Sequence, residues 1–145
     1  MANSLSIVTL AIGLFAATAA RAAEPAAGAG LGGTSWQLVQ FVGGDDTKIK
    51  PDDGSRYTLQ FMTDGKVAAR IDCNRGNGSW ESKKPSELLF GPMATTRAMC
   101  PPGSMHDRIM KDLPQVRSYV LKDGHLFLSL MADAGIYEFE PTAAK

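Results

Sequence analysis

The sequence predicts an α+β fold in which a small antiparallel sheet curls into an incomplete (cracked) barrel, with one helix inserted before the last three strands. Three observations predict it. Short runs with a period of two residues recur along the chain, tight turns join most of them, and only one segment has helical periodicity. Sequential hairpins build an antiparallel sheet, and a lone helix must cover or plug one of its faces. About eight strands form a sheet that is twisted enough to close on itself or to pack a second layer.

The N-terminus predicts export. An apolar run from Leu5 to Ala20 precedes Ala20-Arg21-Ala22, which has small side chains where a signal peptidase reads them, so we expect a signal peptide over 1–22 that is cut after Ala22. The run is shorter than the roughly 20 apolar residues that cross a bilayer, which predicts no stable membrane span. The mature protein is therefore expected to be periplasmic or secreted. Residues 23–30 are nearly all Ala and Gly and predict a flexible leader, and residues 31–142 form the folded domain.

The first half of the domain predicts three longer strands. Thr34 to Val42 is rich in β-forming residues and ends at Gly43-Gly44. The runs Tyr57 to Met62 and Lys66 to Ile71 alternate apolar and polar residues about Asp64-Gly65, which indicates a hairpin. The glycines of Asn74 to Gly78 then predict a turn.

The middle of the domain predicts two short strands and the helix. Ser79 to Ser82 and Glu87 to Phe90 are the strands, each ended by proline-containing breakers. Ser104 is a good N-cap with Asp107 three residues on, as in a capping box, and one apolar face continues to Leu113 before Pro114 ends the helix.

The last part predicts a meander. Its strands are Gln115 to Leu121, Leu126 to Met131 and Ile136 to Phe139, and Asp123-Gly124 marks a second tight hairpin. The aromatic and methionine side chains are expected in the core: Trp36, Tyr57, Phe61, Trp80, Phe90, Met93, Met99, Met105, Met110 and Met131.

The charge balance excludes one class of partner. The chain has 15 basic and 15 acidic side chains, and removal of Arg21 with the signal peptide leaves a balance near minus one. Proteins that bind nucleic acid need a basic surface to displace counterions, so we expect no such partner. We expect a monomer.

The only two cysteines, Cys73 and Cys100, are interpreted as a disulfide, because exported chains meet an oxidising compartment. The alternatives are a redox-active thiol pair or a metal site completed by His106 and His125. Neither a Cys-x-x-Cys spacing nor the spacing of a structural zinc site is present, so we expect no metal and no cofactor.

Two groups of polar residues are candidate binding residues. Asn74 and Arg75 lie beside the predicted glycine turn, and Thr95, Thr96 and Arg97 together could hold an anion. Each group also has a structural interpretation, as turn caps or as partners for backbone groups. Templates for catalytic serine, zinc-protease and phosphate-binding sites are missing, so no catalytic residues and no enzyme activity are predicted.

A family resemblance emerges from these residues. The order Gly33-Thr34-Ser35-Trp36, Cys73-Asn74 with Trp80, and Ala94-Thr95-Thr96-Arg97-Ala98-Met99-Cys100 resembles the META domain family, which includes the heat-shock protein HslJ. The resemblance implies an exported α+β protein of the cell envelope, associated in some members with heat or antibiotic stress. It carries no catalytic residues over. The fold is similar to that of secretion pilotins, which hold lipid in a cracked barrel.

The resulting hypothesis is a non-catalytic stress-protection or binding module of the cell envelope that holds an apolar ligand or an envelope partner protein between helix and sheet. The alternatives are a structural or interaction domain without a small ligand and a thiol-disulfide redox protein.

Overall fold

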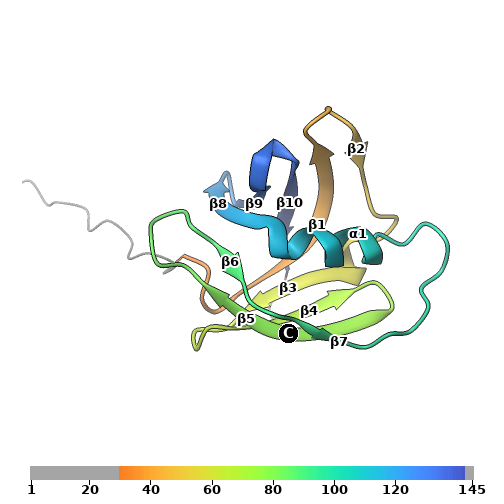
Figure 1. Ribbon diagram of the computed structural model, residues 1–145, viewed down its shortest axis with the longest axis horizontal. Helices are drawn as coiled ribbons and strands as arrows, with labels where there is room; N and C mark the ends of the chain where they lie inside the picture. The colour runs from red at the N-terminus through yellow and green to blue at the C-terminus, as the bar shows by residue number, and fades with distance from the viewer. Residues whose placement is uncertain (1–29, 143–145) are drawn as a thin grey trace, which may run out of the picture.

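One antiparallel sheet dominates the structure, a computed structural model that describes residues 30–142 (Figure 1). The predicted signal peptide and almost all of the leader lie outside these residues. The strands are β1 (Thr34–Gly43), β2 (Lys48–Ile49), β3 (Tyr57–Phe61), β4 (Lys66–Ile71), β5 (Asn74–Glu81), β6 (Leu89–Phe90), β7 (Ala94–Thr95), β8 (Val116–Lys122), β9 (His125–Leu130) and β10 (Gly135–Pro141). Short 3-10 turns are η1 (Gly54–Arg56), η2 (Leu113–Gln115) and η3 (Met131–Asp133), and α1 (His106–Asp112) is the single α-helix of the described part.

The sheet nearly closes into a barrel. Its strand order is β6-β5-β4-β3-β1-β10-β9-β8, with β2 on β1 and β7 on β5. The two ends of this order meet where Glu87 pairs with Ser118, because Leu88 N–H donates to the Arg117 carbonyl at 3.1 Å and Tyr119 N–H to the Ser86 carbonyl at 2.9 Å. After this bridge the chain leaves β8, and β6 pairs with β5, so β6 and β8 are not hydrogen-bonded along the rest of their length. We call this unpaired gap between the two ends of the sheet the seam. The predicted cracked barrel, with one helix before the last three strands, is confirmed.

Alternating side chains fill the interior as the sequence predicts. On β3 the buried residues are Tyr57, Leu59 and Phe61, and β4 contributes a similar row whose Ala69 faces Leu59 across the strands. Burial of one Leu- or Phe-sized side chain stabilises the fold by about 1.5–3 kcal/mol, so this shared interior is the main favourable term. The hairpin at Asp123-Gly124 is also confirmed, with both residues at positive φ (52° and 78°) as a type I′ turn requires.

The helix differs in detail from its prediction. It begins at His106 rather than Ser104, and Met105 occupies the N-cap position without a side-chain cap bond. Ser104 Oγ accepts from His106 N–H at 3.2 Å, whereas Asp107 contacts the His106 ring and does not complete a capping box. The expected box is wrong because the helix begins one residue too late for Ser104 to be its N-cap, and the Asp107 carboxylate contacts His106 instead of a backbone N–H.

Two tyrosine hydroxyls fix α1 over the seam. Tyr57 Oη accepts from Met105 N–H at 3.0 Å, and Tyr137 Oη donates to Asp112 Oδ2 at 2.6 Å, so both ends of the helix are attached to the sheet. Ile109 and Leu113 are buried beneath it. Figure 1 shows α1 lying between the β8–β10 part and the β3–β5 part of the sheet. No helix in residues 30–142 is long and apolar enough to cross a membrane.

The predicted glycine turn at Asn74 to Gly78 is wrong, because these residues are the first half of β5 and the turn lies one step earlier, at Asp72-Cys73. The glycines serve close packing instead. A Cβ on Gly76 would lie 2.9 Å from Met93 Sδ, and one on Gly78 would lie 2.9 Å from the Pro92 carbonyl oxygen. The bare inner face of β5 thus admits the segment that leads into β7.

The predicted methionine core is wrong at two positions. Met99 is 98% exposed beside Cys100, and Met131 is 42% exposed in η3. Met105 is buried, as expected, while Met93 and Met110 pack against the core from its edge. Strands β2 and β7, of two residues each, are too short to produce a sequence pattern.

We expect Tyr137→Phe to destabilise the protein by about 2 kcal/mol at neutral pH, the value of a hydrogen bond to a charged group. Burial and then the bond to Asp112 raise the pKa of Tyr137 above its ordinary value. A raised pKa in the folded state contributes stability that is complete below about pH 10 and is lost as the pH rises further, since the unfolded chain releases the proton first.

The measurement is urea unfolding from pH 7 to 11. Tyr137→Phe should weaken the alkaline decline, whereas Tyr119→Phe, at a buried tyrosine whose hydroxyl has no hydrogen-bond partner in the described residues, should leave it unchanged. Identical alkaline slopes for the parent protein and Tyr137→Phe would contradict the assignment.

Candidate functional site

The disulfide joins two otherwise separate parts of the fold. Cys73 lies in the turn between β4 and β5, and Cys100 lies in the loop between β7 and α1, with a Cα–Cα distance of 5.4 Å. The predicted pairing is confirmed. The bridge is accessible, since Cys73 is exposed and Cys100 is half-buried.

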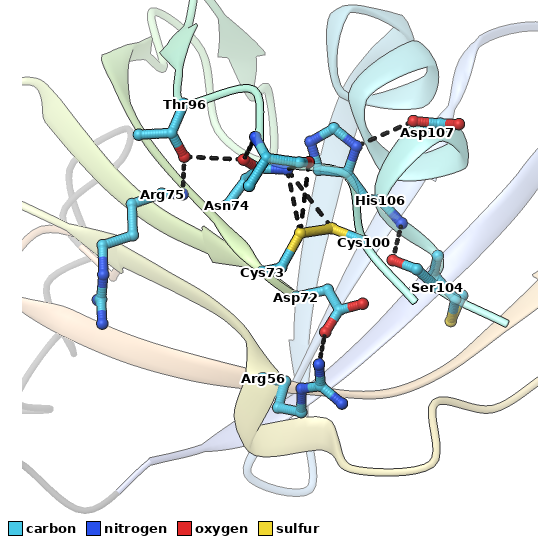
Figure 2. The surroundings of a disulfide bond; sticks show 12 residues. Arg56, Asp72, Cys73, Asn74, Arg75, Thr96, Cys100, Ser104, His106 and Asp107 are labelled. Carbon is cyan, nitrogen blue, oxygen red and sulfur yellow. Dashed lines mark hydrogen bonds and ion pairs between the residues drawn. A yellow bond between two sulfur atoms is a disulfide. The ribbon is translucent and has the colours of Figure 1, made fainter. Parts of the chain in front are cut away.

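Asn74 is the polar centre of this region. Its side chain is buried, and its Oδ1 accepts from Ala98 N–H at 2.7 Å and from Thr96 Oγ1 at 2.8 Å. Its Nδ2 donates to the Ala98 carbonyl at 3.0 Å and lies 3.4–3.5 Å from the two sulfurs (Figure 2). Every polar atom of the amide is therefore occupied by the chain itself, which supports the structural interpretation of Asn74.

The other four candidate binding residues do not all form one site with Asn74. Thr96 joins Asn74 and also accepts from Arg75 N–H at 3.0 Å, but Figure 2 shows the Arg75 side chain pointing away from the disulfide. Thr95 lies opposite Gly76 in β7, and Arg97 is exposed in the following loop. The structure thus brings Asn74 and Thr96 together and directs Arg75 to the outer face of the sheet.

Two titratable side chains near the disulfide, Asp72 and His106, have local partners. Arg56 forms an ion pair with Asp72, whose side chain is 3% exposed, and His106 Nδ1 lies 2.9 Å from Asp107 Oδ1. Within residues 30–142 there is no cluster of three or more His, Cys, Asp and Glu side chains placed to hold a metal ion.

The space predicted between helix and sheet is small. An apolar void of about 20 Å³ lies beneath Ile109 and Leu113, bordered on the sheet side by residues such as Leu59 and Phe139. That is room for about one water molecule. An acyl chain does not fit in the interior of the barrel in this conformation.

A larger apolar groove opens on the surface at the unsealed seam. It has a volume of about 380 Å³, and one wall is the segment from β6 to β7 while the other is α1 with η2. Its lining residues are Phe90, Gly91, Pro92, Met93, Met110, Leu113 and Pro114. We call it the seam groove. An apolar site between helix and sheet is what the sequence analysis expected, but its lining residues were not predicted, because the two walls are 17 or more residues apart along the chain. The local sign was methionine on both sides, a side chain common at adaptable surfaces.

Comparisons with known proteins agree with the fold. Residues 29–142 match the family model described as META domain. A protein from Burkholderia xenovorans solved by NMR is similar over 92% of this chain and 100% of its own, with a TM-score of 0.68 and 22% identity. A DUF4847 family protein from Bacteroides vulgatus is similar over 79% of this chain and 96% of its own, with a TM-score of 0.57 and 16% identity. No curated protein matches significantly.

We expect Asn74→Ala to destabilise the protein by about 2 kcal/mol or more, because it removes a buried amide that makes three hydrogen bonds to Thr96 and Ala98. The matched control is Asn77→Ala on the exposed face of the same strand, which should change stability by less than about 0.5 kcal/mol. Chemical unfolding of both variants measures the difference. Equal, small losses would show that Asn74 does not hold the loop.

Replacement of both cysteines by serine should lower stability by about 3–4 kcal/mol, because the bridge closes a loop between residues separated by 27 positions. Urea unfolding with and without dithiothreitol measures it. The reductant should shift the parent protein towards the variant and should leave the variant unaffected. An unchanged midpoint for the parent protein after complete reduction would contradict a stabilising role.

Proposed function

The chain belongs to the META domain family, and from that premise we propose that it is a non-catalytic binding domain of the cell envelope that holds an apolar ligand in the seam groove. The seam groove is the observation that carries the proposal. Small-molecule sites are mostly apolar and occupy about 300–1,000 Å³, and this groove has about 380 Å³ with an apolar lining.

Both walls of the groove are held in place before any ligand binds. On the β6 side, Gly91 N–H donates to the Ser79 carbonyl at 2.9 Å, and Met93 packs on Gly76. On the helix side, the two tyrosine hydroxyls attach α1 to the sheet. A preformed site loses little conformational entropy on binding, which favours affinity. The side chains of Met93 and Met110 can still adjust to ligands of different shape.

The proposal includes export and a role in stress. A signal peptide over 1–22, a leader over 23–30 and a domain over 31–142 would deliver the barrel to the periplasm or the exterior, where a disulfide persists. In the envelope, a groove for acyl chains would bind lipid fragments that heat or antibiotic damage releases, or it would bind amphipathic drugs directly. The resemblance to HslJ and the accessible disulfide support this placement.

The test is a titration with dodecanoate, followed by NMR chemical shifts and by thermal unfolding. Shifts should concentrate at the groove residues, and the melting temperature should rise with ligand concentration. Met110→Gln should weaken binding about tenfold, because it places an amide in an apolar site. Met99→Gln, at an almost fully exposed methionine outside the groove, is the matched control and should bind like the parent protein.

Two results would contradict the proposal. One is the absence of both chemical-shift changes and a melting-temperature change up to millimolar dodecanoate. The other is equal weakening by Met110→Gln and Met99→Gln, which would show non-specific adsorption to the surface.

A further inference from the structure

A second, polar groove lies on the outer face of β1, β3, β4 and β5, and it is independent of the proposed function. Its volume is about 500 Å³. The lining residues are Ser35, Gln37, Ser55, Thr58, Leu59, Gln60, Arg70, Arg75 and Thr142. Apart from Leu59 they present hydroxyls, amides and two guanidinium groups, and none of them is acidic. We call this the arginine groove.

The two arginines are direct neighbours across β4 and β5. The register places Gln37 opposite Thr58, Thr58 opposite Arg70, and Arg70 opposite Arg75, so one row of side chains crosses the groove. Like charges directly opposite each other in an antiparallel pair destabilise the sheet. The Arg70–Arg75 pair therefore destabilises the sheet unless a negative charge nearby compensates it.

That compensating charge is missing from the described residues. In 30–142 neither Arg70 nor Arg75 forms an ion pair, and the Arg70 Nε–H donates only to the Asp72 carbonyl at 3.4 Å. Hydrogen bonds from Ser55 lower the pKa of Asp53, and the charges of Arg56 and Arg70 contribute to the lowering.

The carboxylates near the groove do not form ion pairs with the two arginines. Asp72 pairs with Arg56, whereas Asp53 accepts from Ser55 and Glu140 accepts from Gln37 at 2.6 Å, which are neutral donors that leave both negative charges in place. In residues 30–142 the two guanidinium groups thus have no direct ion-pair partner, and they line the groove.

We propose that the arginine groove binds an acidic saccharide. The planar guanidinium fork matches a carboxylate or phosphate group, which sets the charged end of the ligand. Hydroxyl and amide side chains of Ser35, Thr58 and Gln60 can both donate and accept, which suits the hydroxyls of a sugar ring. The paired strands β1, β3, β4 and β5 hold this lining in register, so the site exists before the ligand arrives.

The test is isothermal titration calorimetry with four probes: trigalacturonate, glucose 6-phosphate, maltotriose and sodium sulfate. The first two distinguish a carboxylate source from a phosphate source, and binding of either supports the proposal. Maltotriose should not bind measurably, and sulfate should bind at least tenfold more weakly than the better acidic sugar. Sulfate that binds as tightly as both sugars would overturn the assignment, since the saccharide would then contribute nothing.

Charge variants assign the site. Arg70→Gln and Arg75→Gln should each weaken binding of the acidic sugar about tenfold or more, because each removes charge-assisted hydrogen bonds. The control is Arg97→Gln, which removes the same charge from an exposed loop outside the groove and should have less than a twofold effect.

Stability and the other groove give two further readouts. Because Arg75→Gln relieves a like-charge pair, the variant without ligand should melt no lower than the parent protein, and its dodecanoate binding should be unchanged. Equal weakening by all three arginine variants, or no binding of either acidic sugar, would overturn the arginine groove while leaving the seam groove untouched.

Discussion

The attachment of the loop before α1 to the turn between β4 and β5 is the constraint on which the rest of the structure depends. Between β7 and α1 the chain has no strand partner. The Cys73–Cys100 bridge holds it covalently, and three hydrogen bonds of the Asn74 side chain and one of the Arg75 N–H hold it as well. Because only a few residues separate Cys100 from the first turn of the helix, this attachment sets where α1 begins. The helix of seven residues is far too short to be stable alone, so its existence follows from where it is held and what it covers.

The closure of the barrel follows from the same attachment. Glu87, just before β6, bridges to Ser118 in β8, and β6 itself pairs with β5, so the ring is complete at one end only. At the open end α1 and η2 cover the core, and the remaining hollow between them and Phe90 to Met93 is the seam groove. The groove remains because a helix, unlike a further strand, covers the gap in the sheet without hydrogen-bonding along its edge.

The sequence predicted the architecture because its signals are local. Alternation at Tyr57, Leu59 and Phe61, the Asp-Gly turns and the single helical segment each depend on neighbouring residues, and all were found. The wrong turn prediction at Asn74 to Gly78 shows the limit of local signals. A glycine that lets Met93 pack closely on a strand cannot be distinguished, in the sequence, from a glycine that forms a turn. Arg75 was selected with Asn74 as one site, yet strand alternation sends the two side chains to opposite faces of β5. The sequence predicted an apolar site between helix and sheet but not its lining, and it did not predict the arginine groove, because each groove joins segments whose meeting depends on tertiary structure.

The packing of the interior also decides where a ligand can bind. Opening the barrel to an acyl chain requires α1 to leave the sheet, which exposes Ile109 and Leu113 and breaks the hydrogen bonds of Tyr57 and Tyr137. At about 1.5–3 kcal/mol for each apolar side chain, about 1 kcal/mol for the Tyr57 hydrogen bond and about 2 kcal/mol for the bond of Tyr137 to a charged group, the displacement costs about 5 kcal/mol or more. That cost would lower the affinity of an interior ligand by about three to four powers of ten. The two surface grooves need no such displacement, so binding at the outside of a filled barrel is favoured over the lipid-filled interior that the pilotin similarity implied.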